Sequence, residues 1–256
     1  MPTAESENAS SLRGQVVLIT GGRRGIGFAI ATACGAQGAR VALMGRGSSF
    51  AAVARLTAAG VEAMAVRGNV ADSADARRAM EAVVSSFGRL DVLVNNAAVL
   101  HRAPLRETTD QQIAETLDVN VRGVLNMTRA ASDVMIPQRS GVIINIGSDL
   151  ALRGRADYVA YCASKGAVLQ ITRATAIELG AFGIRVVMLS PAATNTEMAA
   201  PSLADPVTRQ ALYDMGTLGR INEPEDVAAA AAFLASPSAR TVTGCNWPVD
   251  AGVLAR

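Results

Sequence analysis

The sequence has few of the residues that most often bind metals or form disulfides. His101 is the only histidine in the 256 residues, and the three cysteines, Cys34, Cys162 and Cys245, are widely separated. A lone histidine argues against a zinc site built from His and Cys ligands. An odd, dispersed set of cysteines is typical of a reducing compartment. We therefore assign no metal ligands and expect a cytoplasmic protein.

The sequence also lacks a strong net charge and a long apolar run. Its formal charge is +2, and no basic run is interleaved with aromatic residues, so we predict no nucleic-acid partner. The longest apolar run, residues 227–235, is about half as long as a bilayer-spanning helix, so we predict no membrane partner. Residues 1–11 are small and polar without the apolar centre of a signal peptide. They predict a flexible tail ahead of a single domain over residues 12–256.

What the sequence does contain is an alternation of short apolar runs with segments of helical composition. Apolar runs predict strands at 15–20, 40–44, 61–66, 90–94, 141–147, 184–190 and 245–249. Helices are predicted at 28–37, 73–87, 110–135 and 224–235, and around Tyr161. Strands that alternate with helices predict an α/β fold: a Rossmann-type, doubly wound, mainly parallel seven-stranded sheet with helices on both faces.

One lysine stands out in a chain that otherwise uses arginine. The chain has 23 Arg and a single Lys, Lys165, which follows Tyr161 by four residues, or about one helical turn. A positive charge about 4 Å away supplies on the order of 4 kcal/mol, enough to lower the pKa of a phenol toward neutrality. Ser148 could hold a substrate oxygen beside that phenol. No histidine is nearby to activate the serine for acyl transfer, so the trio predicts proton transfer at a carbon that gains or loses hydride.

A glycine-rich turn follows the first predicted strand. Gly21, Gly25 and Gly27 lie between that strand and a helix, which is the arrangement of a phosphate-binding site. No Asp or Glu occurs between Gly21 and Val61 to bind a ribose diol, whereas Arg24 and Arg46 could bind a 2′-phosphate. We predict that NADP(H) is preferred, with NAD(H) as the alternative.

Together these motifs resemble the short-chain dehydrogenase/reductase family over about residues 12–253. Residues 20–27 resemble its T-G-x-x-x-G-x-G turn, residues 95–98 resemble its N-N-A-G motif, and Asn120, Ser148, Tyr161 and Lys165 match its catalytic tetrad. The resemblance implies that Tyr161 exchanges the proton, Lys165 lowers its pKa and holds the nicotinamide ribose, Ser148 orients the carbonyl and Asn120 supports a water relay. It also implies a homotetramer that interconverts a small-molecule ketone and alcohol.

The glycine turn, the two arginines and the resemblance together predict the cofactor contacts. These are Gly21, Arg23, Arg24, Gly25, Ile26, Gly27, Arg46, Asn69, Val70, Asn96, Ala97, Tyr161, Lys165, Pro191, Ala192, Thr194 and Thr196. The substrate pocket is predicted to be lined by residues that follow Ser148, the fourth strand or Pro191: Leu100, His101, Leu150, Arg155, Tyr158 and Ala193. The segment 193–216 has no clear periodicity and is predicted to be a lid.

Three alanines depart from the family pattern. Ala98, Ala192 and Ala251 stand where the family usually has glycine, and a Cβ disfavours positive φ there.

Three other functions compete with the main one. They are a 3-oxoacyl-carrier-protein reductase, a sugar epimerase or dehydratase, and a catalytically silent cofactor-binding sensor. Asp133 and Ile177 stand where the first would carry basic residues. The chain is short for the second, and the intact tetrad argues against the third.

Overall fold

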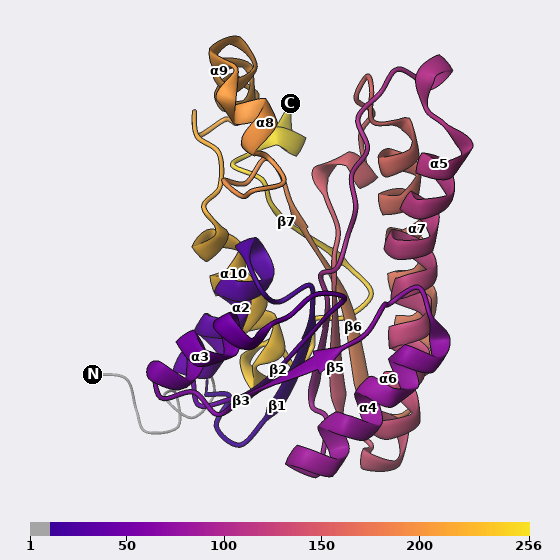
Figure 1. Ribbon diagram of the computed structural model, residues 1–256, viewed down its shortest axis with the longest axis vertical. Helices are drawn as coiled ribbons and strands as arrows, with labels where there is room; N and C mark the ends of the chain where they lie inside the picture. The colour runs from indigo at the N-terminus through magenta and orange to yellow at the C-terminus, as the bar shows by residue number, and fades with distance from the viewer. Residues whose placement is uncertain (1–10) are drawn as a thin grey trace.

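The computed structural model describes residues 11–256 and contains one seven-stranded parallel sheet (Figure 1). Residues 1–10, which make up most of the predicted tail, lie outside the described residues. The strand order is β3-β2-β1-β4-β5-β6-β7, so the chain winds outward in both directions from β1 and β4. The predicted fold class is confirmed. Within residues 11–256 no helix has the length and apolar character that crossing a membrane requires.

The strands are short and mostly buried because helices cover both faces of the sheet. Alternate residues of β1 belong to separate cores: Val17 and Ile19 pack on one face, and Val16 and Leu18 on the other. A strand buried on both faces must be apolar throughout, which explains the runs seen in the sequence. The strands are β1 (Val16–Thr20), β2 (Arg40–Gly45), β3 (Ala63–Arg67), β4 (Val92–Asn95), β5 (Gly141–Ile146), β6 (Ile184–Pro191) and β7 (Asn246–Val249).

The helices form a layer on each face of the sheet. One layer contains α2 (Gly25–Ala36), α3 (Phe50–Ala58) and α10 (Pro224–Ala235). The other contains α4 (Ser73–Phe87), α5 (Asp110–Leu117), α6 (Gly123–Gln138) and α7 (Val159–Gly180) (Figure 1). Two further helices, α8 (Ala200–Ala204) and α9 (Pro206–Met215), extend past the carboxyl ends of the strands.

Two helices begin and end where the sequence predicts, and local capping explains the agreement. The Asp72 side chain accepts a hydrogen bond from Ala74 N at the start of α4, and Gly88 ends that helix with a left-handed φ of 81°. At α10, Pro224 occupies the first turn, and Glu223 and Asp226 form a reciprocal capping box. Such caps are short-range, so they can be recognised in the sequence.

The single helix predicted over 110–135 is wrong. The structure has α5, then a wider π-helical turn over Asp118–Arg122, then α6, which continues to Gln138. Inside that turn Asn120 is buried and hydrogen-bonds to Val99, which lies in a distant loop. The distortion is typical of functional sites and depends on this tertiary contact, so periodicity could not show it. Three helices, α3, α8 and α9, are also absent from the sequence prediction.

Candidate active site

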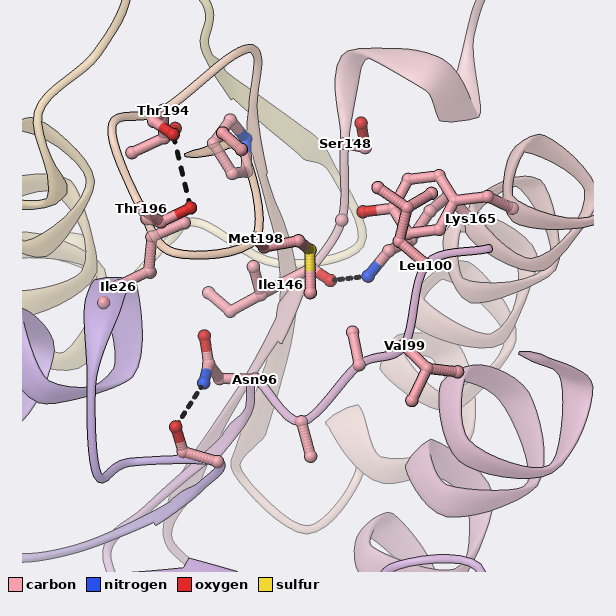
Figure 2. A pocket seen from close by; sticks show the side chains of 18 of the residues that line it. Ile26, Asn96, Val99, Leu100, Ile146, Ser148, Lys165, Thr194, Thr196 and Met198 are labelled. Carbon is pink, nitrogen blue, oxygen red and sulfur yellow. Dashed lines mark hydrogen bonds between the residues drawn. The ribbon is translucent and has the colours of Figure 1, made fainter. Parts of the chain in front are cut away.

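A cavity of about 390 Å³ lies at the carboxyl ends of β1, β2, β4, β5 and β6, with the segment after β6 closing one side (Figure 2). Ligands in open α/β sheets bind at this edge. Of the predicted residues, three do not line it: Gly27, His101 and Asn120. The predicted residues that do line it are Gly21, Arg23, Arg24, Gly25, Ile26, Arg46, Asn69, Val70, Asn96, Ala97, Leu100, Ser148, Leu150, Arg155, Tyr158, Tyr161, Lys165, Pro191, Ala192, Ala193, Thr194 and Thr196.

The glycine turn is fastened to the loop that follows β4. Thr20 Oγ1 accepts hydrogen bonds from the backbone N–H of Asn96 and of Ala97, both at 3.0 Å. The Asn96 amide donates to the carbonyl oxygens of Thr20 and Gly21 (Figure 2). Gly21 and Gly25 have φ values of 66° and 53°, which favour glycine. The turn is therefore held in place at the start of α2, where free backbone N–H groups can bind an anion.

Gly27 has a packing function that the cavity alone does not reveal. A Cβ at this position would lie 2.5 Å from the Asn96 amide nitrogen and 2.7 Å from the Gly21 carbonyl oxygen. These distances leave no room for a side chain. Gly27 thus permits close packing of α2 on the turn itself.

The two arginines predicted to bind a 2′-phosphate both have carboxylate neighbours. Arg24 precedes α2 and pairs with Glu197, which follows β6. Arg46 follows β2, and its Nη1 lies 3.9 Å from Glu115 Oε1. His101, which does not line the cavity, contacts the other Glu115 oxygen at 3.0 Å. Both arginines are more than half exposed, so their donors remain accessible at the mouth of the cavity.

Lys165 is buried beside Tyr161. Its Nζ donates a 2.7 Å hydrogen bond to the carbonyl oxygen of Ile146, the last residue of β5 (Figure 2). Nζ lies 5.5 Å from the centroid of the Tyr161 ring. Burial lowers the pKa of Lys165 from 10.5 to about 8. Tyr161 and Lys165 therefore lie close together, as predicted, but this lysine loses its proton at a lower pH than an exposed lysine would.

The pKa of Tyr161 shifts in the direction opposite to the sequence prediction. Burial of the phenol raises this pKa well above its ordinary value of 10, the charge of Asp149 raises it further, and a hydrogen bond with Ser148 opposes the change. The prediction counted the Lys165 charge but neither the desolvation of the phenol nor the nearby carboxylate. In this arrangement Tyr161 holds its proton at neutral pH and can donate it.

A buried carboxylate next to Ser148 is the main feature that the sequence prediction missed. Asp149 Oδ1 accepts a 3.0 Å hydrogen bond from Ser148 Oγ, which itself accepts one from Leu150 N. Asp149 also pairs with Arg153, whose Nη2 lies 2.6 Å from Asp149 Oδ2 and 3.6 Å from the sulfur of Met215 in α9. The Asp-x-x-x-Arg spacing alone does not predict this pair, because Asp149–Ala151 forms a 3₁₀ turn and Arg153 lies outside it rather than one turn along an α-helix.

Asn120 connects the π-helical turn to α7 rather than facing the cavity. Its amide donates to the Val99 carbonyl and to Ser164 Oγ, while its carbonyl accepts from Val99 N at 2.9 Å. Ser164 Oγ in turn donates to the carbonyl oxygen of Tyr161 at 2.7 Å. Asn120 therefore positions the loop after β4 against the first turn of α7.

Only one of the three alanine departures has the backbone conformation expected of glycine. Ala251 has a φ of 52°, and its carbonyl oxygen accepts a hydrogen bond from Leu218 N. A left-handed non-glycine residue costs about 1–2 kcal/mol. Ala98 and Ala192 keep negative φ values, so their side chains strain neither loop. Backbone strain from these substitutions is thus limited to Ala251, which lies outside the loops predicted to bind the cofactor.

The residues at the first half of the cavity fit a dinucleotide. The turn supplies backbone N–H groups and two positive-φ glycines, and Asn69 and Val70 also line the cavity. Arg23, Arg24 and Arg46 add positive charge, and no acidic residue follows β2. Free amides and guanidinium groups are the donors that phosphate oxygens require.

Comparisons with known proteins agree with this geometry. A family model described as "Enoyl-(Acyl carrier protein) reductase" matches residues 20–254. The chain is 37% identical to D-threitol dehydrogenase of Mycolicibacterium smegmatis, covering 94% of this chain and 93% of that one. It is 36% identical to a 3-oxoacyl-(acyl-carrier-protein) reductase of Staphylococcus aureus, covering 92% and 96%.

Solved structures extend the similarity to the whole fold. A gluconate 5-dehydrogenase from Burkholderia cenocepacia, solved in complex with NADP and tartrate, superposes with a TM-score of 0.95. It is 30% identical and covers 98% of this chain and 99% of its own. The names of these three proteins give different substrates, so the overall similarity does not identify the substrate of this chain.

Proposed function

The chain belongs to the short-chain dehydrogenase/reductase family of oxidoreductases, and from this we propose an NADP(H)-dependent enzyme that interconverts a carbonyl and a secondary alcohol with Tyr161 as general acid/base. The observation that carries the proposal is the position of Tyr161. Its phenol lines the cavity beside Ser148 and Lys165, and the glycine turn lines the same cavity.

In this proposal each residue of the chain acts on a proton or on its position. When bound, NADP(H) supplies or accepts the hydride. Tyr161 is protonated at neutral pH and donates to the carbonyl oxygen as it becomes an alcohol. Lys165 uses one of its three N–H donors on Ile146 O, which leaves donors for the ribose and for the phenol oxygen. Ser148 Oγ donates to Asp149 and therefore offers a lone pair to a substrate hydroxyl.

The preference for NADP(H) rests on charge at the mouth of the cavity. A 2′-phosphate would meet Arg24 and Arg46, both exposed by more than half, and it would compete with Glu197 and Glu115 for them. A relative solved with NADP, described above, supports the same cofactor.

The direct test is consumption of NADPH in the presence of a broad panel of ketones and aldehydes, followed by absorbance. We expect turnover with at least one compound and its loss in Tyr161→Phe. If NADPH binds tightly but no compound is reduced, the chain is better described as the cofactor-binding sensor.

A 3-oxoacyl-carrier-protein reductase is the second candidate, because one relative above carries that name. An acidic carrier protein needs a basic docking surface. The positions where we expect such a surface instead hold Asp133 and Ile177, both exposed on α6 and α7. Reduction of a 3-oxoacyl thioester only when it is attached to the carrier protein would favour this candidate.

A further inference from the structure

The substrate end of the cavity contains a guanidinium that no carboxylate neutralises. Arg153 also lines this end, but it pairs with the buried carboxylate of Asp149. Arg24, beside the glycine turn, pairs with Glu197 in an exposed ion pair. Arg155 lines the cavity and forms no ion pair with any carboxylate in residues 11–256. The substrate end therefore has a net positive charge at Arg155.

Arg155 is held in place by an aromatic ring. Its guanidinium carbon lies 4.9 Å from the centroid of Tyr158, which is buried. Stacking of this kind restrains the planar guanidinium while leaving its N–H donors free. Tyr158 immediately precedes α7, the helix that carries Tyr161, and Arg155 and Tyr161 line the same cavity.

The rest of this end of the cavity is mostly apolar. Leu100 and Met198 point into it (Figure 2), and Leu150, Leu212 and Met215 complete the wall. An apolar wall favours a hydrocarbon body in the substrate. A single restrained fork suits a carboxylate, whose two oxygens it can bind in parallel, better than a doubly charged phosphate, for which more than one cation is usual.

We propose that the substrate is an oxo monocarboxylate, or the corresponding hydroxy acid, with a hydrocarbon body whose carboxylate binds Arg155. This rests on the proposed oxidoreductase function and assigns Arg155 as the residue that sets substrate specificity. Loss of a charged hydrogen-bonding partner for the carboxylate corresponds to a roughly 10- to 100-fold weaker interaction.

The test compares each acid with its uncharged ester. The panel is 4-oxopentanoate, 5-oxohexanoate, 6-oxoheptanoate and 7-oxooctanoate with their methyl esters, measured with NADPH. For the best chain length we expect kcat/KM to be at least about tenfold higher for the acid than for the ester. In Arg155→Leu the KM for the acid should rise by a similar factor, and the constants for the ester should change less than about twofold. Equal values for acid and ester in the wild type, or an equal loss for both in the variant, would overturn the proposal.

Arg102→Leu is the matched control. Arg102 also lies over the Tyr158 ring, at 5.9 Å, but it pairs with Asp157 and does not line the cavity. Its loss removes the same charge and should leave the acid-to-ester ratio unchanged. Arg155→Lys keeps the charge without the fork and should give an intermediate KM, which preserves the test if Arg155→Leu does not fold.

A binding measurement separates this proposal from the proposed function. Hexanoate and hexanamide have the same length and differ in charge, and neither can be reduced at an internal carbonyl. We expect calorimetry to show hexanoate binding to the NADP-loaded protein at least about tenfold more tightly than hexanamide, with the difference lost in Arg155→Leu. That result without any turnover would reject the oxidoreductase and keep the anion site. No preference for hexanoate would reject the anion site.

Discussion

At the scale of single residues, the electrostatics of Tyr161 differ most from what the sequence suggested. Burial and the charge of Asp149 raise the pKa of the phenol most, Cys162 and Tyr158 raise it further, and the hydrogen bond with Ser148 lowers it. Ser148 and Asp149 stand thirteen and twelve positions before the tyrosine in the sequence. The balance leaves Tyr161 as a proton donor at neutral pH. Reduction of a carbonyl, which uses the protonated phenol, should therefore proceed at neutral pH. Oxidation of an alcohol, which uses the phenolate, should need a higher pH.

Removing the phenol oxygen tests this assignment. Tyr161→Phe should reduce kcat by at least about 100-fold, the lower end for general acid–base catalysis, because phenylalanine has no proton to give to the carbonyl oxygen. NADPH binding, measured by fluorescence titration, should change little. Near-normal turnover would remove Tyr161 from the mechanism.

The pKa of Lys165 makes stability depend on pH. The unfolded chain keeps this amine protonated up to about 10.5, whereas the folded protein releases the proton near pH 8. The unfolded state therefore binds more protons above pH 8, and this group makes folding more favourable as pH rises. The free energy of unfolding should rise by about 1 kcal/mol between pH 8 and 9.

Lys165→Met provides the comparison. It retains an apolar side chain of similar length, so denaturant unfolding at the two pH values should lose the contribution of this amine. Burial raises the pKa of Cys34 from 9.0 to about 12, which acts in the opposite direction once the unfolded thiol begins to ionise, and this effect is common to both proteins. An identical pH dependence in wild type and variant would contradict the lowered pKa.

Arg46 gives a residue-scale test of cofactor preference. Arg46→Asp should weaken NADPH binding about 10- to 100-fold and NADH binding much less, because only the former carries a 2′-phosphate. Arg106→Asp makes the same change of charge at an exposed position that does not line the cavity, and should affect neither. Equal weakening of both cofactors by Arg46→Asp would refute the assignment.

At the scale of elements, the π-helical turn between α5 and α6 explains how Asn120 acts without reaching the cavity. Its three hydrogen bonds hold Val99 on one side and Ser164 on the other. Val99 belongs to the loop lining the cavity, and Ser164 lies one residue before Lys165. The turn therefore fixes the distance between two walls of the site.

Asn120→Ala should loosen both walls. It leaves buried backbone and hydroxyl groups without partners, which costs about 1–3 kcal/mol and lowers Tm by roughly 3–10 °C. Because the two walls of the site are no longer held together, kcat should also fall when it is measured at a temperature where the variant is fully folded. Asn126→Ala removes a comparable buried bond, to Val70 O, and serves as the control for stability. Equal kcat in the two variants would limit Asn120 to a stabilising role.

At the scale of the whole molecule, the helix layer containing α5, α6 and α7 exposes several large apolar side chains. Leu117, Leu125 and Ile177 are 41%, 45% and 83% exposed. Apolar groups on one layer favour association between copies of a chain. The resemblance to the family implies a tetramer built through the helices that carry Asn120 and Tyr161, which is this layer.

We expect a mass in solution of four times the 26.4 kDa chain, measured by light scattering during size exclusion. Ile177→Arg should reduce that mass, because an unpaired charge would be buried in each interface. Asp133→Arg is the control, because Asp133 is already polar and exposed, and it should reduce the mass less. A monomeric wild-type protein would contradict the expectation.

The sequence alone determined the order and type of most elements. Strand β1 and helices α4 and α10 follow from apolar runs and caps that act within a few residues. The glycine turn and the Tyr161–Lys165 spacing were likewise visible, because each depends on the local geometry of a turn or a helix. Several of these features follow predicted strands, and the carboxyl ends of strands in such a sheet meet at one edge.

Tertiary structure decided what depends on distant groups. The π-helical turn at Asn120, the raised pKa of Tyr161 and the pairing of Arg153, but not Arg155, all result from contacts or burial that arise only when the chain folds. Desolvation and charge pairing depend on surroundings rather than on residue type. The sequence thus determined which groups this protein has for chemistry, and folding determined their charge states and which of them remain free to bind a ligand.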